Sequence, residues 1–64
     1  MKGLKNVDAT KYKIGDRISV KGNKEIFNNW EIIHRKDDGD FIVQNVNNNR
    51  FLVVAPSDIE DLIP

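Results

Sequence analysis

The chain of 64 residues contains no cysteine, and it has one histidine and two prolines. Without cysteine, the chain can form neither disulfides nor thiolate metal sites. The single histidine, His34, cannot build a zinc site without several carboxylate ligands. No apolar run reaches the roughly 18 residues of a membrane span, and residues 1–5 are not followed by the apolar stretch of a signal peptide. These absences predict a soluble protein without metal or cofactor, in the cytoplasm of a bacterial host cell.

The size of the chain limits how it can be stabilised. Sixty-four residues form one domain, and a chain this short buries only about 60% of its unfolded surface. Disulfides and metals are excluded, so compact packing, self-association or a bound partner must compensate. We predict an N-terminal arm over residues 1–11 and a single domain over residues 12–64.

Several short segments alternate apolar and polar residues, which is the period of a half-buried β-strand. The run Phe51–Val54 is continuously apolar, and it predicts a strand covered on both faces. We expect strands over residues 17–21, 30–35, 41–46, 50–55 and 60–63.

Turn residues separate these segments. Asp38-Gly39 is typical of a hairpin, because glycine tolerates the positive φ that a type I′ turn requires. Asn47–Asn49 predicts a second turn, since asparagine enters the left-handed region more easily than other side chains. Ser57 and Glu60 have the spacing of a capping box, which predicts one helical turn before the last strand.

The predicted fold class is therefore all-β: a small five-stranded barrel with one short 3-10 turn before the last strand. Both faces of residues 31–46 carry apolar groups, so a slip of one residue would exchange them. We expect the core to contain Ile18, Val20, Trp30, Ile32, Phe41, Val43, Phe51, Val53, Ile59 and Leu62.

Three short motifs fit one superfamily: Gly15-Asp16 before the first strand, Trp30 opening the second after a long loop, and Pro56-Ser57 before the last. With these motifs the chain resembles the Src-homology-3-like barrels, which include the Kyrpides–Ouzounis–Woese and Tudor-like modules. The resemblance covers residues 11–63 and implies a five-stranded barrel. Peptide-binding members place an aromatic side chain where this chain has Ile59, so recognition of proline-rich ligands is not expected.

Catalysis is not expected either. His34 has no serine or cysteine placed by a recognisable motif to act as its nucleophile. Asp37, Asp38 and Asp40 surround a turn, but they lack the ligand alternation and distal glutamate of a calcium loop. Aspartates also favour turns for their own backbone hydrogen bonds.

We expect a non-catalytic binding module that acts in trans on a protein partner. Richness in asparagine, lysine and isoleucine indicates an AT-rich genome, so a phage or mobile-element accessory protein that inhibits or modulates a host factor is one hypothesis. Loops vary without breaking a core, so recognition collects on them. Trp30 is either a core residue or a half-exposed anchor. The predicted partner-binding residues lie in the loop before the second strand and at the next hairpin: Lys24, Phe27, Asn28, Asn29, Trp30 and Asp38.

A nucleic-acid-binding barrel is the alternative. Residues 1–24 carry seven basic and two acidic groups, whereas residues 25–64 carry three basic and eight acidic groups. Such asymmetry can form a basic face for phosphates, although the sequence pI near 6.5 is low for a dedicated binder. A third hypothesis is an oligomeric protein that sequesters a small molecule. The predicted nucleic-acid contacts are Lys11, Lys13, Arg17 and Lys21.

Overall fold

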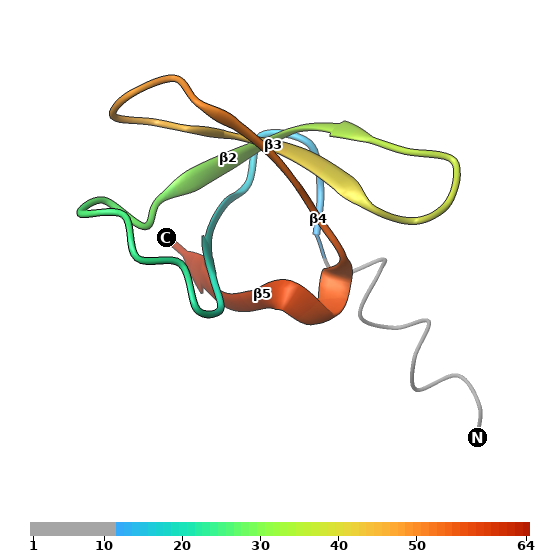
Figure 1. Cartoon of the computed structure of the whole chain (residues 1–64). Helices are drawn as coiled ribbons and strands as arrows, with labels where there is room; N and C mark the ends of the chain where they lie inside the picture. The colour runs from blue at the N-terminus through green and yellow to red at the C-terminus, as the bar shows by residue number, and fades with distance from the viewer. Residues whose placement is uncertain (1–11) are drawn as a thin grey trace.

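The computed structural model describes residues 12–64, so the predicted arm and Lys11 lie outside the described residues. The five strands form one antiparallel sheet in the order β4-β3-β2-β1-β5 (Figure 1). The sheet curves so that β5 crosses below the β2–β3–β4 layer. The elements are β1 (Arg17–Val20), β2 (Trp30–Arg35), β3 (Phe41–Asn45), β4 (Phe51–Val54), the 3-10 turn η1 (Pro56–Asp58) and β5 (Ile59–Ile63).

These elements confirm the predicted all-β class, with five strands and one 3-10 turn before the last. Each strand overlaps the segment expected from its alternating apolar residues. Closure of the sheet into a barrel stays a prediction.

The hairpin between β2 and β3 is confirmed, but its turn type differs from the prediction. Gly39 has φ +96°, whereas Asp38 is not among the described residues with positive φ. Gly39 N donates to Lys36 O at 3.1 Å, and Lys36 N donates to Asp40 O at 2.8 Å. Three residues therefore connect the strands, with only the last in the left-handed region, so the type I′ prediction is wrong.

The hairpin between β3 and β4 turns on asparagine, as expected. Asn49 has φ +64° and is the one non-glycine residue of 12–64 with a positive value. Its amide donates to Asn45 O at 3.0 Å. The sequence therefore indicated both the turn and the residue type that could adopt the left-handed conformation.

The core lies between the curved layers of the sheet. Its centre contains Trp30 and Phe41, both almost fully buried. Tyr12 was not predicted to be buried, but its ring meets Phe41 edge to face, with centroids 6.2 Å apart. Arg35 places its guanidinium 5.4 Å from the Phe41 centroid and donates to Tyr12 O at 2.8 Å. The buried apolar residues are Tyr12, Ile18, Val20, Trp30, Ile32, Phe41, Val43, Val54 and Ile59.

The predicted inward face of β4 is wrong. Phe51 and Val53 are 63% and 53% exposed. The register explains this, because directly opposite residues of antiparallel strands share one face. Val54 stands opposite the buried Phe41, so Val54 points inward, and Leu52, two residues earlier, packs against the core. The expectation that β4 is covered on both faces is also wrong for the described residues.

Two smaller corrections concern the end of the chain. Leu62 was expected in the core but is about half exposed, because β5 is an edge strand and its side chains are covered from one flank only. The cap of η1 lies two residues earlier than predicted. Asp58, not Glu60, reaches back, and its Oδ2 accepts a hydrogen bond from Ala55 N at 3.1 Å.

The adjacent valines of β4 test the register directly. At low protein concentration, Val54→Ala should lower the free energy of unfolding by about 2–3 kcal/mol, because it leaves a gap in the core. Val53→Ala should cost less than about 1 kcal/mol, because its side chain is half exposed. Urea denaturation of both variants measures the difference, and equal or reversed costs would contradict the register.

Candidate functional site

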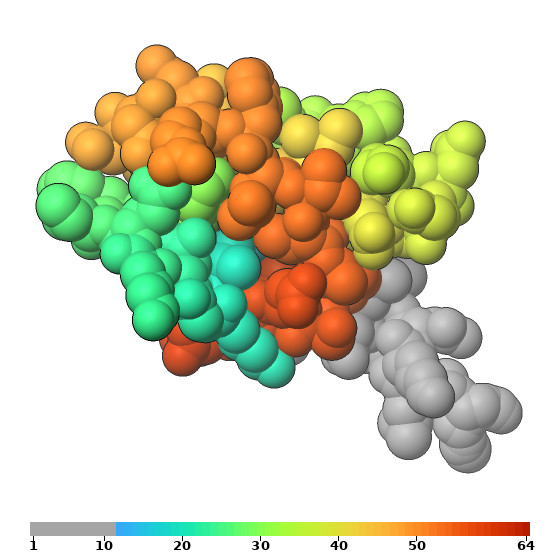
Figure 2. Space-filling view, viewed as in Figure 1, coloured from blue at the N-terminus to red at the C-terminus, as the bar shows by residue number. Residues whose placement is uncertain are grey.

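The longest connection of the described residues, residues 21–29 between β1 and β2, lies against the turn between β3 and β4. Figure 2 shows the green atoms of this loop beside the orange atoms of the turn. A backbone hydrogen bond ties the two segments together, since Val46 N donates to Asn29 O at 3.1 Å. We call these two segments, residues 21–29 and 46–50, the loop pair.

Asn28 attaches the loop to β1 and to the core. Its Oδ1 accepts from Val20 N at 2.9 Å and from the Trp30 indole Nε1 at 3.1 Å. Its Nδ2 donates to Val20 O at 2.9 Å. The amide therefore completes the backbone pairing at the end of β1 and satisfies the only polar atom of the buried indole.

Asn45 joins the two members of the loop pair from below. Its side chain is completely buried, and Nδ2 donates to Phe27 O at 2.7 Å. Its Oδ1 accepts from Asn47 N at 2.8 Å and from Asn48 N at 3.2 Å. One amide therefore fixes the carbonyl of the loop and two amides of the turn, and a buried amide satisfied in this way rigidifies its surroundings.

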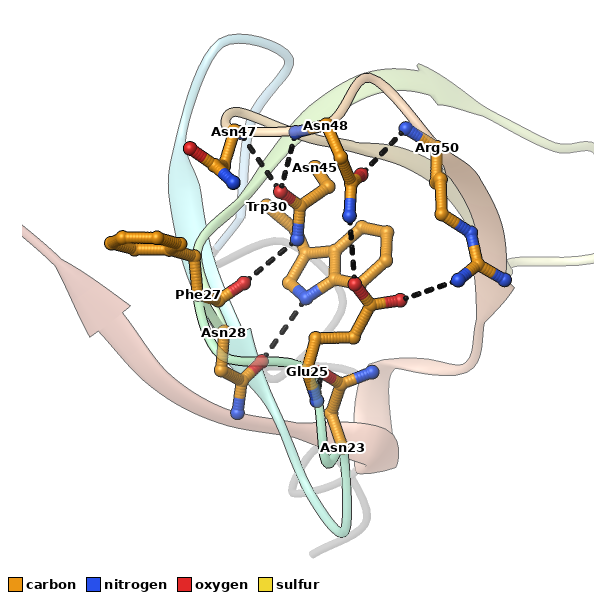
Figure 3. A network of polar contacts seen from close by, with 9 residues as sticks. All are labelled: Asn23, Glu25, Phe27, Asn28, Trp30, Asn45, Asn47, Asn48 and Arg50. Carbon is orange, nitrogen blue, oxygen red and sulfur yellow. Dashed lines mark hydrogen bonds and ion pairs between the residues drawn. The ribbon is translucent and has the colours of Figure 1, made fainter.

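A second layer of contacts lies nearer the solvent. Asn48 Nδ2 donates to Glu25 Oε1 at 2.8 Å, and Arg50 Nη1 lies 3.2 Å from Glu25 Oε2. Asn23 Oδ1 accepts from Glu25 N at 3.1 Å. Figure 3 shows these side chains arranged over the Trp30 ring. Exposed pairs of this kind are individually weak, but they add to the attachment that Asn45 provides.

The loop pair presents apolar side chains outward. Ile26 is 92% exposed and Phe27 is 53% exposed on the loop, and Val46 is 40% exposed on the turn. We call Ile26, Phe27 and Val46 the apolar tip. Because hydrogen bonds hold the Phe27 carbonyl and the side chain of Asn28, the fold fixes the backbone from which the exposed ring projects.

The predicted partner-binding residues of the loop divide into two groups. Lys24 and Phe27 lie exposed on the loop surface. Trp30 is a core residue and not a half-exposed anchor. The Asn28 side chain is used in internal hydrogen bonds. Asn29 is half-buried, and its Oδ1 has no hydrogen-bond partner among the described residues.

Asp38 does not join the loop. It lies in the turn at the far end of β2, on the opposite side of the molecule from residues 21–29 (Figure 1). Its Oδ1 accepts from Asp40 N at 3.0 Å, which closes its own turn. The loop's neighbour is instead the asparagine turn after β3.

The predicted nucleic-acid contacts do not form a continuous cationic surface among the described residues. Arg17 stands opposite Glu31, and Asp61 stands opposite Ser19, on the outer face of β1 and its neighbours. Lys13 and Lys21 are exposed beyond the two ends of β1. Acidic groups therefore interrupt the line of cations that phosphates require.

The described residues offer no second chemical site of comparable definition. His34, Lys36, Asp37 and Asp38 line an open depression. Within residues 12–64 no group of three histidine, aspartate or glutamate side chains is placed to hold a metal. In the same part of the chain, no helix is long and apolar enough to cross a bilayer.

The sequence held one signal for this site that the predictions missed. Asn45 has the same parity as Phe41 and Val43 along β3, so the alternation places an amide where an apolar side chain is expected. A polar residue at an inward position must find internal partners. Two of those partners are backbone amides of the following turn, but the third is the Phe27 carbonyl, 18 residues away, which the sequence alone does not indicate.

No family model matches the chain, and no curated protein or solved structure is significantly similar to it.

Asn45→Asp tests whether this amide holds the loop. The substitution keeps the acceptor oxygen for the turn but places a second oxygen against Phe27 O, so we expect a loss of about 1–3 kcal/mol in unfolding free energy. Hydrogen exchange at residues 26–29 should accelerate more than in the rest of the chain. Asn47→Asp, the same change at an exposed position, is the matched control. Equal effects of the two changes would contradict the assignment.

Proposed function

We propose that the chain is a non-catalytic module that binds a protein partner through the apolar tip. The observation that carries this proposal is that Phe27 has a held backbone and an exposed side chain. Its carbonyl is held at 2.7 Å by a completely buried amide, while about half of its surface remains exposed. An exposed aromatic side chain on a held backbone suits a binding hot spot, because little backbone ordering entropy is lost on association.

The surroundings of the apolar tip support a protein partner over a nucleic acid. Glu25, the residue before Ile26, pairs with Arg50 of the turn, so the loop pair that carries the tip has charges of both signs. An apolar centre with a mixed polar rim is the common arrangement of protein interfaces. A surface for phosphates would require cations without compensating acids.

The all-β architecture is consistent with a small barrel that acts as a binding module. Five short strands and a 3-10 turn before the last agree with the resemblance to Src-homology-3-like barrels, and we place the chain in that superfamily as part of the proposal. In this fold class the strands carry the core, and recognition collects on the connections between them.

Photocrosslinking can identify the partner. The full chain with benzoylphenylalanine at position 27 should crosslink to a protein in a lysate of the native host, and mass spectrometry identifies it. The same probe at Ile14, an exposed residue outside the loop pair, is the control for nonspecific capture. The partner is then purified for binding measurements.

Phe27→Ala should weaken binding to that purified partner by roughly 1–3 kcal/mol, the range of an aromatic hot spot, while the melting temperature stays unchanged. Phe51→Ala removes an exposed phenylalanine elsewhere and should leave the affinity unchanged. Titration calorimetry measures both. Normal binding by Phe27→Ala, together with salt-sensitive loss in Lys13→Ala and Lys21→Ala, would reject the proposal in favour of nucleic-acid binding.

A further inference from the structure

The outer edge of β4 is unpaired within residues 12–64 and lacks the residues that usually protect an edge strand from pairing. β4 is the last strand of the sheet on one side, and no strand within residues 12–64 pairs with its outer edge. Its sequence, Phe51–Val54, contains no charge and no proline, the residues by which edge strands commonly avoid pairing. In Figure 2 this segment, in orange, lies on the viewed face with no other segment over it.

The register shows which backbone groups are available. Asn45 N donates to Arg50 O at 2.8 Å, so Asn45 and Arg50 are a hydrogen-bonded pair. Such pairs alternate along an antiparallel ladder. Leu52 and Val54 therefore bond to β3, whereas the N–H and C=O groups of Phe51 and Val53 point away from it, toward the free edge.

We propose that a second copy of the chain pairs with this edge, β4 against β4, antiparallel about a two-fold axis at Leu52. Phe51 of each copy then stands opposite Val53 of the other. Both residues have outward backbone groups, so each pair exchanges two hydrogen bonds. A symmetric pairing uses the same patch on both copies and closes at two subunits.

The side chains of the edge fit this arrangement. Phe51 and Val53 are both exposed on the outer face, with Ile42 half-buried opposite Val53. In the dimer, Phe51 packs beside Val53 of the other copy, and an aromatic paired with a β-branched residue is favourable across strands. The pairing therefore covers apolar surface that the described residues leave open.

The charges at the two ends of β4 favour a second copy over other strands. Arg50, which pairs with Glu25 of its own chain, precedes the strand with its side chain still 70% exposed, and the exposed Asp58 lies in the turn that follows it. Antiparallel pairing brings the cationic start of one β4 beside the acidic turn of the other. β5, the opposite edge strand, carries Glu60 and Asp61, which protect it from pairing.

This inference rests on β4 and is independent of the apolar tip. The test measures the mass of the full chain by sedimentation equilibrium up to about 1 mM, a range that detects weak association. We expect the average mass to rise toward that of two chains. Val53→Lys should raise the dissociation constant by roughly tenfold or more, because it places a charge at the centre of the pairing. Ile14→Lys, the same change at an exposed residue away from β4, should dimerise normally.

A second variant separates pairing from folding. The chain synthesised with N-methylvaline at position 53 keeps its side chain but loses the outward N–H, and we expect it to remain folded and monomeric. A monomeric wild-type chain throughout the range would overturn the proposal, as would assembly beyond two copies. Dimerisation that survives either change at Val53 would overturn it too. Phe27→Ala should not affect the dimer, so failure of the partner-binding proposal remains distinguishable.

Discussion

The side-chain amide of Asn45 is the contact on which one end of this molecule depends. It is completely buried, and it bonds to backbone groups of both the β1–β2 loop and the β3–β4 turn. A buried amide that loses a partner costs about 1–3 kcal/mol, a large fraction of the stability of a domain this small. The loop is therefore held as part of the folded structure rather than added to its surface.

The same amide explains why an exposed loop can serve recognition. Asn45 fixes the Phe27 carbonyl, and the next residue, Asn28, is fixed to Val20 and Trp30. The core therefore determines the position of a side chain that lies outside it. In a domain with few buried residues, this arrangement supplies a rigid contact surface without a second layer of structure.

Most of the strands could be predicted because their alternation and turn residues are local signals. Trp30 to Arg35 was located at both ends, and Asn49 adopts the left-handed conformation that its residue type allows. The inward face of β4 could not be predicted, because Phe51 to Val54 are all apolar and alternation cannot distinguish the faces. Only pairing with β3 decides it. At the site, Phe27 could be predicted as a contact residue because it is an aromatic residue in a polar loop. The hydrogen bond from Asn45 could not be predicted, because it depends on tertiary structure.

The continuous apolar run of β4 leaves apolar side chains on the outer face of the sheet. A continuous apolar run predicts cover on both sides, and the sheet of residues 12–64 supplies it on one side, where Leu52 packs against the core. Small domains commonly obtain missing stability by association, and an edge strand with apolar residues on its outer face is a suitable place for it. The proposed β4–β4 pairing would bring apolar side chains of a second copy beside Phe51 and Val53 on that face.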